Sequence, residues 1–239
     1  MSERVVFVHS TGATSDMWRR IPLEAIGGRD AAYPANVGYP PNRALARGER
    51  KDERDDAAGV VRAAEGAERV HLVAHSYGGL VALRALEGLG ARVASLVVYE
   101  PVLFAASYFD DPRFADDDDR GGTEPWLRVF VDFWNRPGAW DKLPEGARAE
   151  LRNLGWVMYQ EARACAHMTT PFEAWPIAAP TTILVGERSP AVSARTARAL
   201  ADAQPRATLR ILPRLGHMAP LTSPAPVAAA IAEHFAGLR

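Results

Sequence analysis

The chain of 239 residues is poor in cysteine, in lysine and in long apolar runs, and each shortage excludes some classes of protein. Cys165 is the only cysteine, so no disulfide can form within the chain and a reducing, cytoplasmic location is expected. Its helical, apolar surroundings favour a small buried hydrophobe over a reactive thiol. No apolar run approaches the ~20 residues of a membrane span. A strand pattern also begins too early for a signal peptide.

Neither acidic nor basic residues are in excess. The chain has 28 basic and 29 acidic residues, and its formal net charge is −1. Lysine occurs only at Lys51 and Lys142, so the other basic residues are arginine. A nucleic-acid-binding surface or a basic membrane-binding face is therefore not expected. The length suits one α/β domain with an insertion and a full hydrophobic core.

The most informative stretch covers residues 69–83. An apolar segment of strand length meets Ser76, and the apolar spacing then becomes helical. The pattern predicts a strand, a tight turn with Ser76 at its apex, and a helix, with small residues that let the two backbones approach. Ala-x-Ser-x-Gly is a variant of the Gly-x-Ser-x-Gly nucleophile elbow. The alternative is that Ser76 is the N-cap of an ordinary strand-to-helix turn.

Strand and helix patterns alternate on both sides of this stretch. Residues 21–32 are predicted to form a helix and then a short strand. Further strands are predicted at 4–9, 70–74, 94–100, 181–186 and 208–212, and further helices near 52–64, 190–203 and 224–237. The alternation predicts an α/β fold with a mostly parallel central sheet and helices on both faces. Residues 1–100 and 177–239 would form this core, and ligands would bind at the carboxyl ends of its strands.

Residues 101–176 break the alternation. An acidic loop around 110–119, expected to be a solvated connection, is followed by two amphipathic helix patterns. Because the insertion follows a strand end close to the Ser76 site, we expect a helical cap over that site. Its expected substrate-binding side chains are Trp126, Phe130, Phe133 and Trp134. The alternative is a helical layer that buries its own tryptophans.

A serine hydroxyl is a weak nucleophile unless a base takes its proton, so a histidine is needed near Ser76. His217 lies in a Gly- and Pro-containing loop, 212–220, between the last predicted strand and helix. A histidine in such a loop is not needed to pack a hydrophobic core, so we predict that His217 is the base rather than a surface residue. The other histidines belong to strand or helix patterns, and His9 is placed to brace the loop after the first strand.

The order of these features resembles an α/β-hydrolase-fold serine hydrolase of the capped, esterase- or lipase-like kind. The elbow at 74–79, the insertion, a Gly-Glu-Arg turn at 186–188 and Gly216-His217 follow one another as in that family, over nearly the whole chain. The resemblance implies an oxyanion hole made by the backbone N–H groups of Tyr77 and Thr11. It implies neither a metal ion nor an organic cofactor.

Besides the alanine of the elbow, the chain departs from the family pattern at two further places. The family's His-Gly is His9-Ser10 here, and its acidic turn Gly-x-x-Asp ends at Ser189. Ser189 followed by Pro190 predicts only a helix N-cap and first turn. Some members of the family carry the acid after the strand that follows the elbow helix, where Glu100 stands. We therefore predict Glu100 as the third triad member, with Glu187 as the alternative.

The resemblance implies a serine hydrolase that cleaves a carboxylic ester with an apolar portion through an acyl-enzyme. Serine at the elbow argues against the dehalogenase and epoxide hydrolase branches, which carry aspartate there. Thioesterase, lactonase, perhydrolase and carbon–carbon bond hydrolase stay open. So does a non-catalytic ligand-binding protein on this fold, which the missing Asp favours. The expected partner is a small-molecule ester, with acyl length and oligomeric state undetermined.

Overall fold

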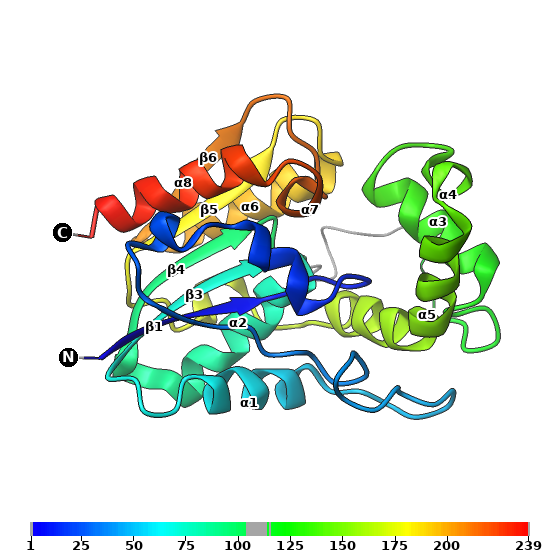
Figure 1. The fold of residues 1–239 in the computed structure, drawn as a ribbon, viewed down its shortest axis with the longest axis horizontal. Helices are drawn as coiled ribbons and strands as arrows, with labels where there is room; N and C mark the ends of the chain where they lie inside the picture. Colours follow the sequence, from blue (N-terminus) through cyan, green and yellow to red (C-terminus); the bar gives the residue numbers. More distant parts are fainter. Residues whose placement is uncertain (1, 104–113, 115, 239) are drawn as a thin grey trace.

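A parallel sheet organises the computed structural model, which describes residues 2–103, 114 and 116–238 (Figure 1). Within these residues the strands run in the order β2-β1-β3-β4-β5-β6, and each neighbouring pair is parallel. Their bounds are β1 (Glu3–Val8), β2 (Asp30–Ala32), β3 (Arg69–His75), β4 (Val93–Tyr99), β5 (Thr181–Gly186) and β6 (Ala207–Leu212). The predicted α/β fold with a mostly parallel sheet is confirmed.

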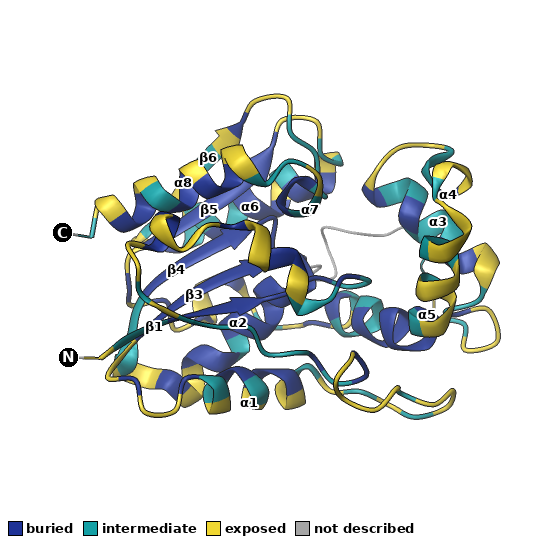
Figure 2. Ribbon diagram, viewed as in Figure 1, coloured by how far each residue is buried: buried dark blue, intermediate teal, exposed yellow. Residues whose placement is uncertain are grey.

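Helices cover both faces of the sheet, because successive strand side chains point to opposite sides. In β1, Val6 and Val8 pack with α1 (Glu53–Ala63), α2 (Tyr77–Leu89) and α6 (Ala191–Ala203). Val5 and Phe7 pack on the other face with η1 (Ser15–Arg20), η2 (Leu23–Ile26) and α8 (Pro224–Ala236). Figure 2 shows the inner strands β1, β3, β4 and β5 mostly buried between these two layers. The remaining short elements are η3 (Gly90–Arg92), η5 (Phe172–Ala174) and α7 (Ala219–Thr222).

The register of the central strands brings two predicted site residues together. His75 at the end of β3 pairs with Tyr99 at the end of β4. Ser76 and Glu100 are the next residues, so they leave the sheet side by side at its carboxyl edge. The Ser76 N–H donates to the Tyr99 carbonyl at 3.0 Å, and the Glu100 N–H to the Leu184 carbonyl at 2.8 Å.

Helices α3 (Glu124–Trp134), α4 (Ala139–Lys142) and α5 (Glu145–Ala166) form a helical segment beyond the carboxyl ends of the strands (Figure 1). Two helix patterns were expected here, and the structure adds the short α4. The segment has its own apolar cluster, which includes Trp126, Trp140 and Tyr159. The predicted insertion at 101–176 and its acidic loop fall partly on residues 104–113 and 115, which lie outside the described residues. In the described part of the chain, no helix is long and apolar enough to cross a membrane.

Candidate active site

Ser76 occupies the sharp turn between β3 and α2. Its backbone has φ 57° and ψ −123°, a conformation that residues other than glycine rarely adopt. Such strain costs about 1–3 kcal/mol and persists only where the surroundings impose it. A Cβ at position 78 would lie 2.6 Å from the Val8 and His9 carbonyl oxygens, so only glycine fits where α2 passes the end of β1. The close backbone approach predicted for the elbow is therefore present.

His217 faces Ser76 from the loop after β6. Its Nε2 lies 3.1 Å from the Ser76 hydroxyl oxygen. Two buried side chains at the strand ends hold this loop: the Tyr99 hydroxyl donates to the Gly216 carbonyl at 2.8 Å, and His75 Nε2 donates to the His217 carbonyl at 2.9 Å. Burial holds the pKa of His75 well below its ordinary value, so this imidazole is neutral.

Glu100 is the carboxylate that meets His217. Its Oε2 accepts from His217 Nδ1 at 2.7 Å, and the side chain is fully buried. Its Oε1 accepts from the Gly186 N–H at 2.7 Å and from the Ser189 hydroxyl. Because Nδ1 donates to Glu100, Nε2 is free to accept the proton of Ser76. Burial alone would raise the pKa of Glu100, but the hydrogen bonds and charge of His217, together with the other two donors, lower it below 4.5.

Of the two carboxylates considered for this position, Glu100 is the one with a hydrogen bond to His217. The Glu187 side chain bonds elsewhere in the His217 loop, where its Oε2 accepts from the Arg214 N–H at 2.8 Å. The predicted N-cap role of Ser189 is wrong: α6 begins at Ala191 with Pro190 as N-cap, and Ser189 donates to Glu100 instead. Ser189, at the family's Asp position, thus donates a hydrogen bond to the carboxylate that contacts His217.

Thr11 and Tyr77, the predicted oxyanion donors, flank Ser76. Tyr77 is the first residue of α2, and the first-turn N–H groups of a helix have no acceptor within the helix. Thr11 follows β1, and it lines the same cavities as Ser76. His9 braces this loop as expected, because its Nδ1 donates to the Ser10 carbonyl and its Nε2 accepts from the Asn36 N–H, each at 3.0 Å.

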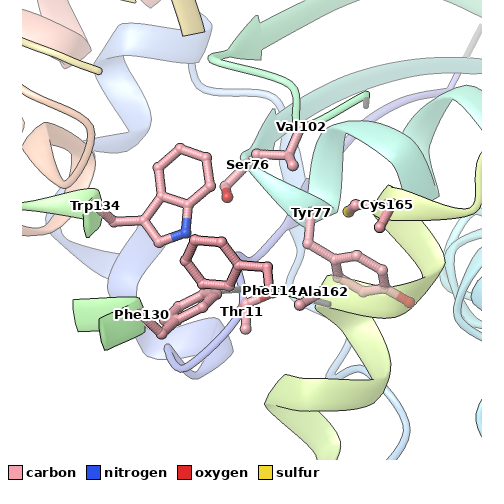
Figure 3. A pocket seen from close by; sticks show the side chains of 10 residues that line it. Thr11, Ser76, Tyr77, Val102, Phe114, Phe130, Trp134, Ala162 and Cys165 are labelled. Carbon is pink, nitrogen blue, oxygen red and sulfur yellow. The ribbon is translucent and has the colours of Figure 1, made fainter. Parts of the chain in front are cut away.

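Two neighbouring cavities are lined by Ser76 and Thr11. The smaller has a volume of about 30 Å³ and apolar walls that include Tyr77, Val102 and Cys165 (Figure 3). The larger has a volume of about 530 Å³ and extends along α5. His217 lines the larger cavity and does not line the smaller one. The site therefore offers two unequal spaces that share the serine as a lining residue.

The aromatic side chains of α3 are divided between the cavities and the core. Phe130 and Trp134 line both cavities. The Trp134 ring also stacks on His217, with centroids 4.1 Å apart. Trp126 is not among the lining residues and packs edge-on against Tyr159 in the apolar cluster of the helical segment. Phe133 is not among them either and packs against the sheet-side core.

Cys165 is buried, as expected for a small hydrophobe, and burial raises the pKa of its thiol well above the ordinary value. It nevertheless lines the smaller cavity next to Ser76, which the helical pattern did not indicate. Sequence reasoning also missed the contacts of His75 and Tyr99 with the His217 loop. The available signal was their position: His75 directly precedes Ser76, and Tyr99 directly precedes Glu100, each at the end of a predicted strand.

The match to a family pattern agrees with this geometry. The pattern of the alpha/beta hydrolase family matches residues 5–230, and the chain belongs to this family. The resemblance inferred from the elbow, the insertion and the histidine loop is thereby confirmed. No curated protein sequence matches the chain.

Solved structures with a similar fold include hydrolases of several kinds. An esterase from Thermogutta terrifontis is 21% identical in sequence and has a TM-score of 0.74. The match covers 100% of this chain and 91% of the esterase chain. An N-acyl homoserine lactone degrading enzyme is 16% identical with a TM-score of 0.75, covering 98% and 93%. A meta-cleavage product hydrolase from Pseudomonas fluorescens is 17% identical with a TM-score of 0.71, covering 100% and 92%. At these identities the similarity establishes the fold alone.

Proposed function

We propose that the chain is a serine hydrolase that cleaves a carboxylic ester through an acyl-enzyme. The observation that carries this proposal is the continuous hydrogen-bonded series from Ser76 through His217 to Glu100. Ser76 Oγ attacks the ester carbonyl carbon while His217 Nε2 takes its proton, and Glu100 stabilises the imidazolium that forms. A non-catalytic binding protein has less support, because Glu100 supplies a carboxylate that hydrogen-bonds to His217 although the family's usual Asp is missing.

The negative charge that develops on the carbonyl oxygen needs donors fixed in advance. In this proposal the Thr11 and Tyr77 N–H groups supply them. His217 then gives its proton to the leaving alcohol oxygen as the tetrahedral intermediate collapses to the acyl-enzyme. In the second half of the reaction, a water molecule attacks the acyl carbonyl carbon while His217 takes its proton. His217 then returns that proton to Ser76 Oγ as the carboxylic acid is released. Each step uses side chains of this chain, and no cofactor is required.

The position of His217 assigns the two cavities to the two halves of an ester. The leaving oxygen must lie within hydrogen-bond reach of His217 Nε2, so the alcohol portion would occupy the larger cavity, which His217 lines. The acyl portion would then occupy the smaller, apolar cavity. Its volume of about 30 Å³ corresponds to roughly two water-sized spheres. We therefore propose a short acyl group, such as acetyl or propionyl, joined to a bulkier alcohol.

We also propose that the helical segment acts as a cap over this site. Phe130 and Trp134 on α3, with Leu154 and Met158 on α5, form walls of the larger cavity opposite the loops of the core. The stacking of Trp134 on His217 links the segment directly to the base. The cap would therefore shape the substrate space and exclude water from His217.

The primary test is the loss of the nucleophile. Ser76→Ala is expected to abolish labelling by an organophosphonate and to lower p-nitrophenyl acetate turnover by several orders of magnitude. Ser193→Ala is the matched control, because Ser193 is equally buried but lies on α6, outside both cavities. Undiminished turnover in Ser76→Ala would exclude the mechanism. A wild-type protein without turnover on any short-acyl ester would favour the binding-protein alternative.

The acyl assignment is tested by a series of p-nitrophenyl esters from acetate to octanoate. Phe130→Ala enlarges the space next to Ser76 and is expected to raise the octanoate-to-acetate ratio of kcat/KM about tenfold, since each accommodated methylene is worth ~1 kcal/mol or more. Phe133→Ala removes the same ring from the same helix at a position that lines neither cavity. It is expected to lower the melting temperature and leave the ratio unchanged. Equal ratios in the two variants would remove Phe130 from the substrate space.

A further inference from the structure

Three ionisable side chains outside the proposed triad are buried together beneath the Thr11 loop. Lys51 lies just before α1, Asp56 on α1 and Glu161 on α5, and each side chain is at most 1% exposed. Lys51 Nζ lies 2.6 Å from Glu161 Oε1 and 3.0 Å from Asp56 Oδ2, and it donates to the Val37 carbonyl at 3.0 Å. All three ammonium protons therefore have partners. We call these residues the Lys51 cluster.

Stability alone does not account for the Lys51 cluster. Removing three charges from water costs several kcal/mol per ion, and well-packed apolar side chains are often as stable in such places. The cluster also holds two carboxyl groups against one ammonium group. Burial raises the pKa of Glu161 above its ordinary value, against the opposing effects of Lys51 and of the Thr11 side chain. Its hydrogen bonds to neighbouring elements indicate what it does.

Glu161 holds the loop that carries one proposed oxyanion donor. Its Oε2 accepts from the Tyr39 hydroxyl at 2.8 Å, and that hydroxyl in turn accepts from the Gly12 N–H at 2.9 Å. The Thr11 side chain also hydrogen-bonds to Glu161. Two successive loop residues are thus tied to one buried carboxyl group on α5.

Asp56 holds the residue that carries the other proposed donor. Its Oδ2 accepts from the Tyr77 hydroxyl at 2.6 Å, and its Oδ1 accepts from the Val37 N–H at 2.6 Å. The Tyr77 side chain is buried, so this contact fixes the first residue of α2 from below. Lys51 bridges the two carboxyl groups and so links Thr11 to Tyr77 through a continuous set of short contacts.

We propose that Lys51, Asp56 and Glu161 are positioning residues that set the separation and direction of the Thr11 and Tyr77 N–H groups. The inference rests on the proposed function, because it assigns the cluster to that oxyanion hole. Donors of this kind act only if they are aimed in advance at the developing oxyanion. A misplacement of ~1 Å can cost ~100-fold in rate. The expected signature is therefore a loss in kcat with little change in KM.

Tyr39→Phe and Glu161→Gln test the proposal with the least risk to folding, since each keeps the shape of the side chain. We expect kcat for p-nitrophenyl acetate to fall about 10- to 100-fold in each, with KM within about twofold. Affinity for an alkyl boronic acid, whose tetrahedral adduct uses the same donors, is expected to fall by a similar factor. Because both changes break the same link, the double variant is expected to lose no more than about threefold beyond the worse single variant.

Glu53→Gln is the matched control for these variants. Glu53 pairs with Arg84 at 3.1 Å between α1 and α2, partly buried, and makes no recorded contact with the Thr11 loop. Its kcat and boronic acid affinity should stay within about twofold of wild type even if its melting temperature falls. If the cluster variants kept wild-type kcat and boronate affinity, or lost them only as much as Glu53→Gln does, the proposal would be overturned.

Amide hydrogen exchange separates this inference from the proposed function. Tyr39→Phe deprives the Gly12 N–H of its acceptor, so peptides covering residues 10–13 should exchange at least tenfold faster whether or not the protein is catalytic. Faster exchange with an inert wild type would remove the proposed esterase function and leave the cluster as the structure that orders the loop. Unchanged exchange would show that the cluster does not hold the loop.

Discussion

Glu100→Gln keeps the shape of the side chain and replaces one carboxylate oxygen by an amide NH₂. Two donors, the Gly186 N–H and the Ser189 hydroxyl, point at the Oε1 position, so the amide oxygen of Gln is expected to settle there. The NH₂ group then faces His217 Nδ1 and donates to it. Nε2 must carry the ring proton in that tautomer, and it can no longer accept the proton of Ser76.

The structure therefore predicts a loss of the tautomer as well as of the charge. A change of this kind lowers turnover by about 10³- to 10⁴-fold. This corresponds to roughly 4 to 5 kcal/mol of transition-state stabilisation. The assay is steady-state kcat with p-nitrophenyl acetate at pH 8, with circular dichroism of each variant to show that its fold is intact.

Glu187→Gln is the matched control, because the same substitution is made on the neighbouring turn at a side chain that does not reach His217. Its kcat is expected to stay within about twofold of wild type. A loss below tenfold in a folded Glu100→Gln protein would refute the assignment of Glu100. So would an equal loss in the Glu187 variant.

Ser189→Ala removes one of the donors to Glu100 and leaves Gly186 and His217 in place. We therefore expect kcat to fall about threefold to tenfold. A loss as large as that of Glu100→Gln would contradict this reasoning. The pH dependence of stability follows from the lowered pKa of Glu100. Its folded-state value lies below the ordinary 4.5, so the ionised carboxylate stabilises the fold above about pH 4.5 and loses this contribution as the pH falls through the folded value. Urea titrations from pH 6 to 3 should show the unfolding free energy of wild type falling toward that of Glu100→Gln, and a constant difference would contradict the shift.

Most strands could be read from the sequence, because buried parallel strands are continuous apolar runs with polar or proline boundaries. β5, for example, spans Thr181–Gly186, the range that its apolar residues predicted. For residues 21–32 the sequence predicts a helix and then a short strand. The strand is confirmed as β2, but the helix is wrong, because only the 3₁₀ turn η2 forms there. Pro22 removes a backbone donor inside that apolar pattern, and only a short turn follows it.

Ser76 and His217 were predictable because each lies in a local pattern, and Glu100 because chain order placed it at a strand end beside the elbow. The structure brings the three together, while their catalytic roles stay predictions. The partner of Ser189 could not be read in the same way. Its hydroxyl meets a carboxylate 89 residues away, and a serine followed by proline carries no local trace of such a contact.

The aromatic face of α3 shows a similar limit. A spacing of four residues places Trp126, Phe130 and Trp134 on one helical face, but it does not say which part of the protein that face contacts. The packing of α5 against one end of that face buries Trp126, and the cavities open at the other end, near Ser76. Which aromatic residue contacts substrate thus depends on tertiary packing rather than on periodicity.

The order in which the site residues occur along the chain has a consequence for folding. Ser76 and Glu100 end the two strands of a single β-α-β unit built around α2, so short-range contacts bring them together. His217 lies 141 residues after Ser76 and 117 after Glu100, and it reaches them only once β6 and its loop have docked. Contacts between distant segments form late, because their loop entropy is lost before they are gained. A growing chain can therefore place Ser76 beside Glu100 early, and the proposed triad is complete only after the loop that carries His217 has been added.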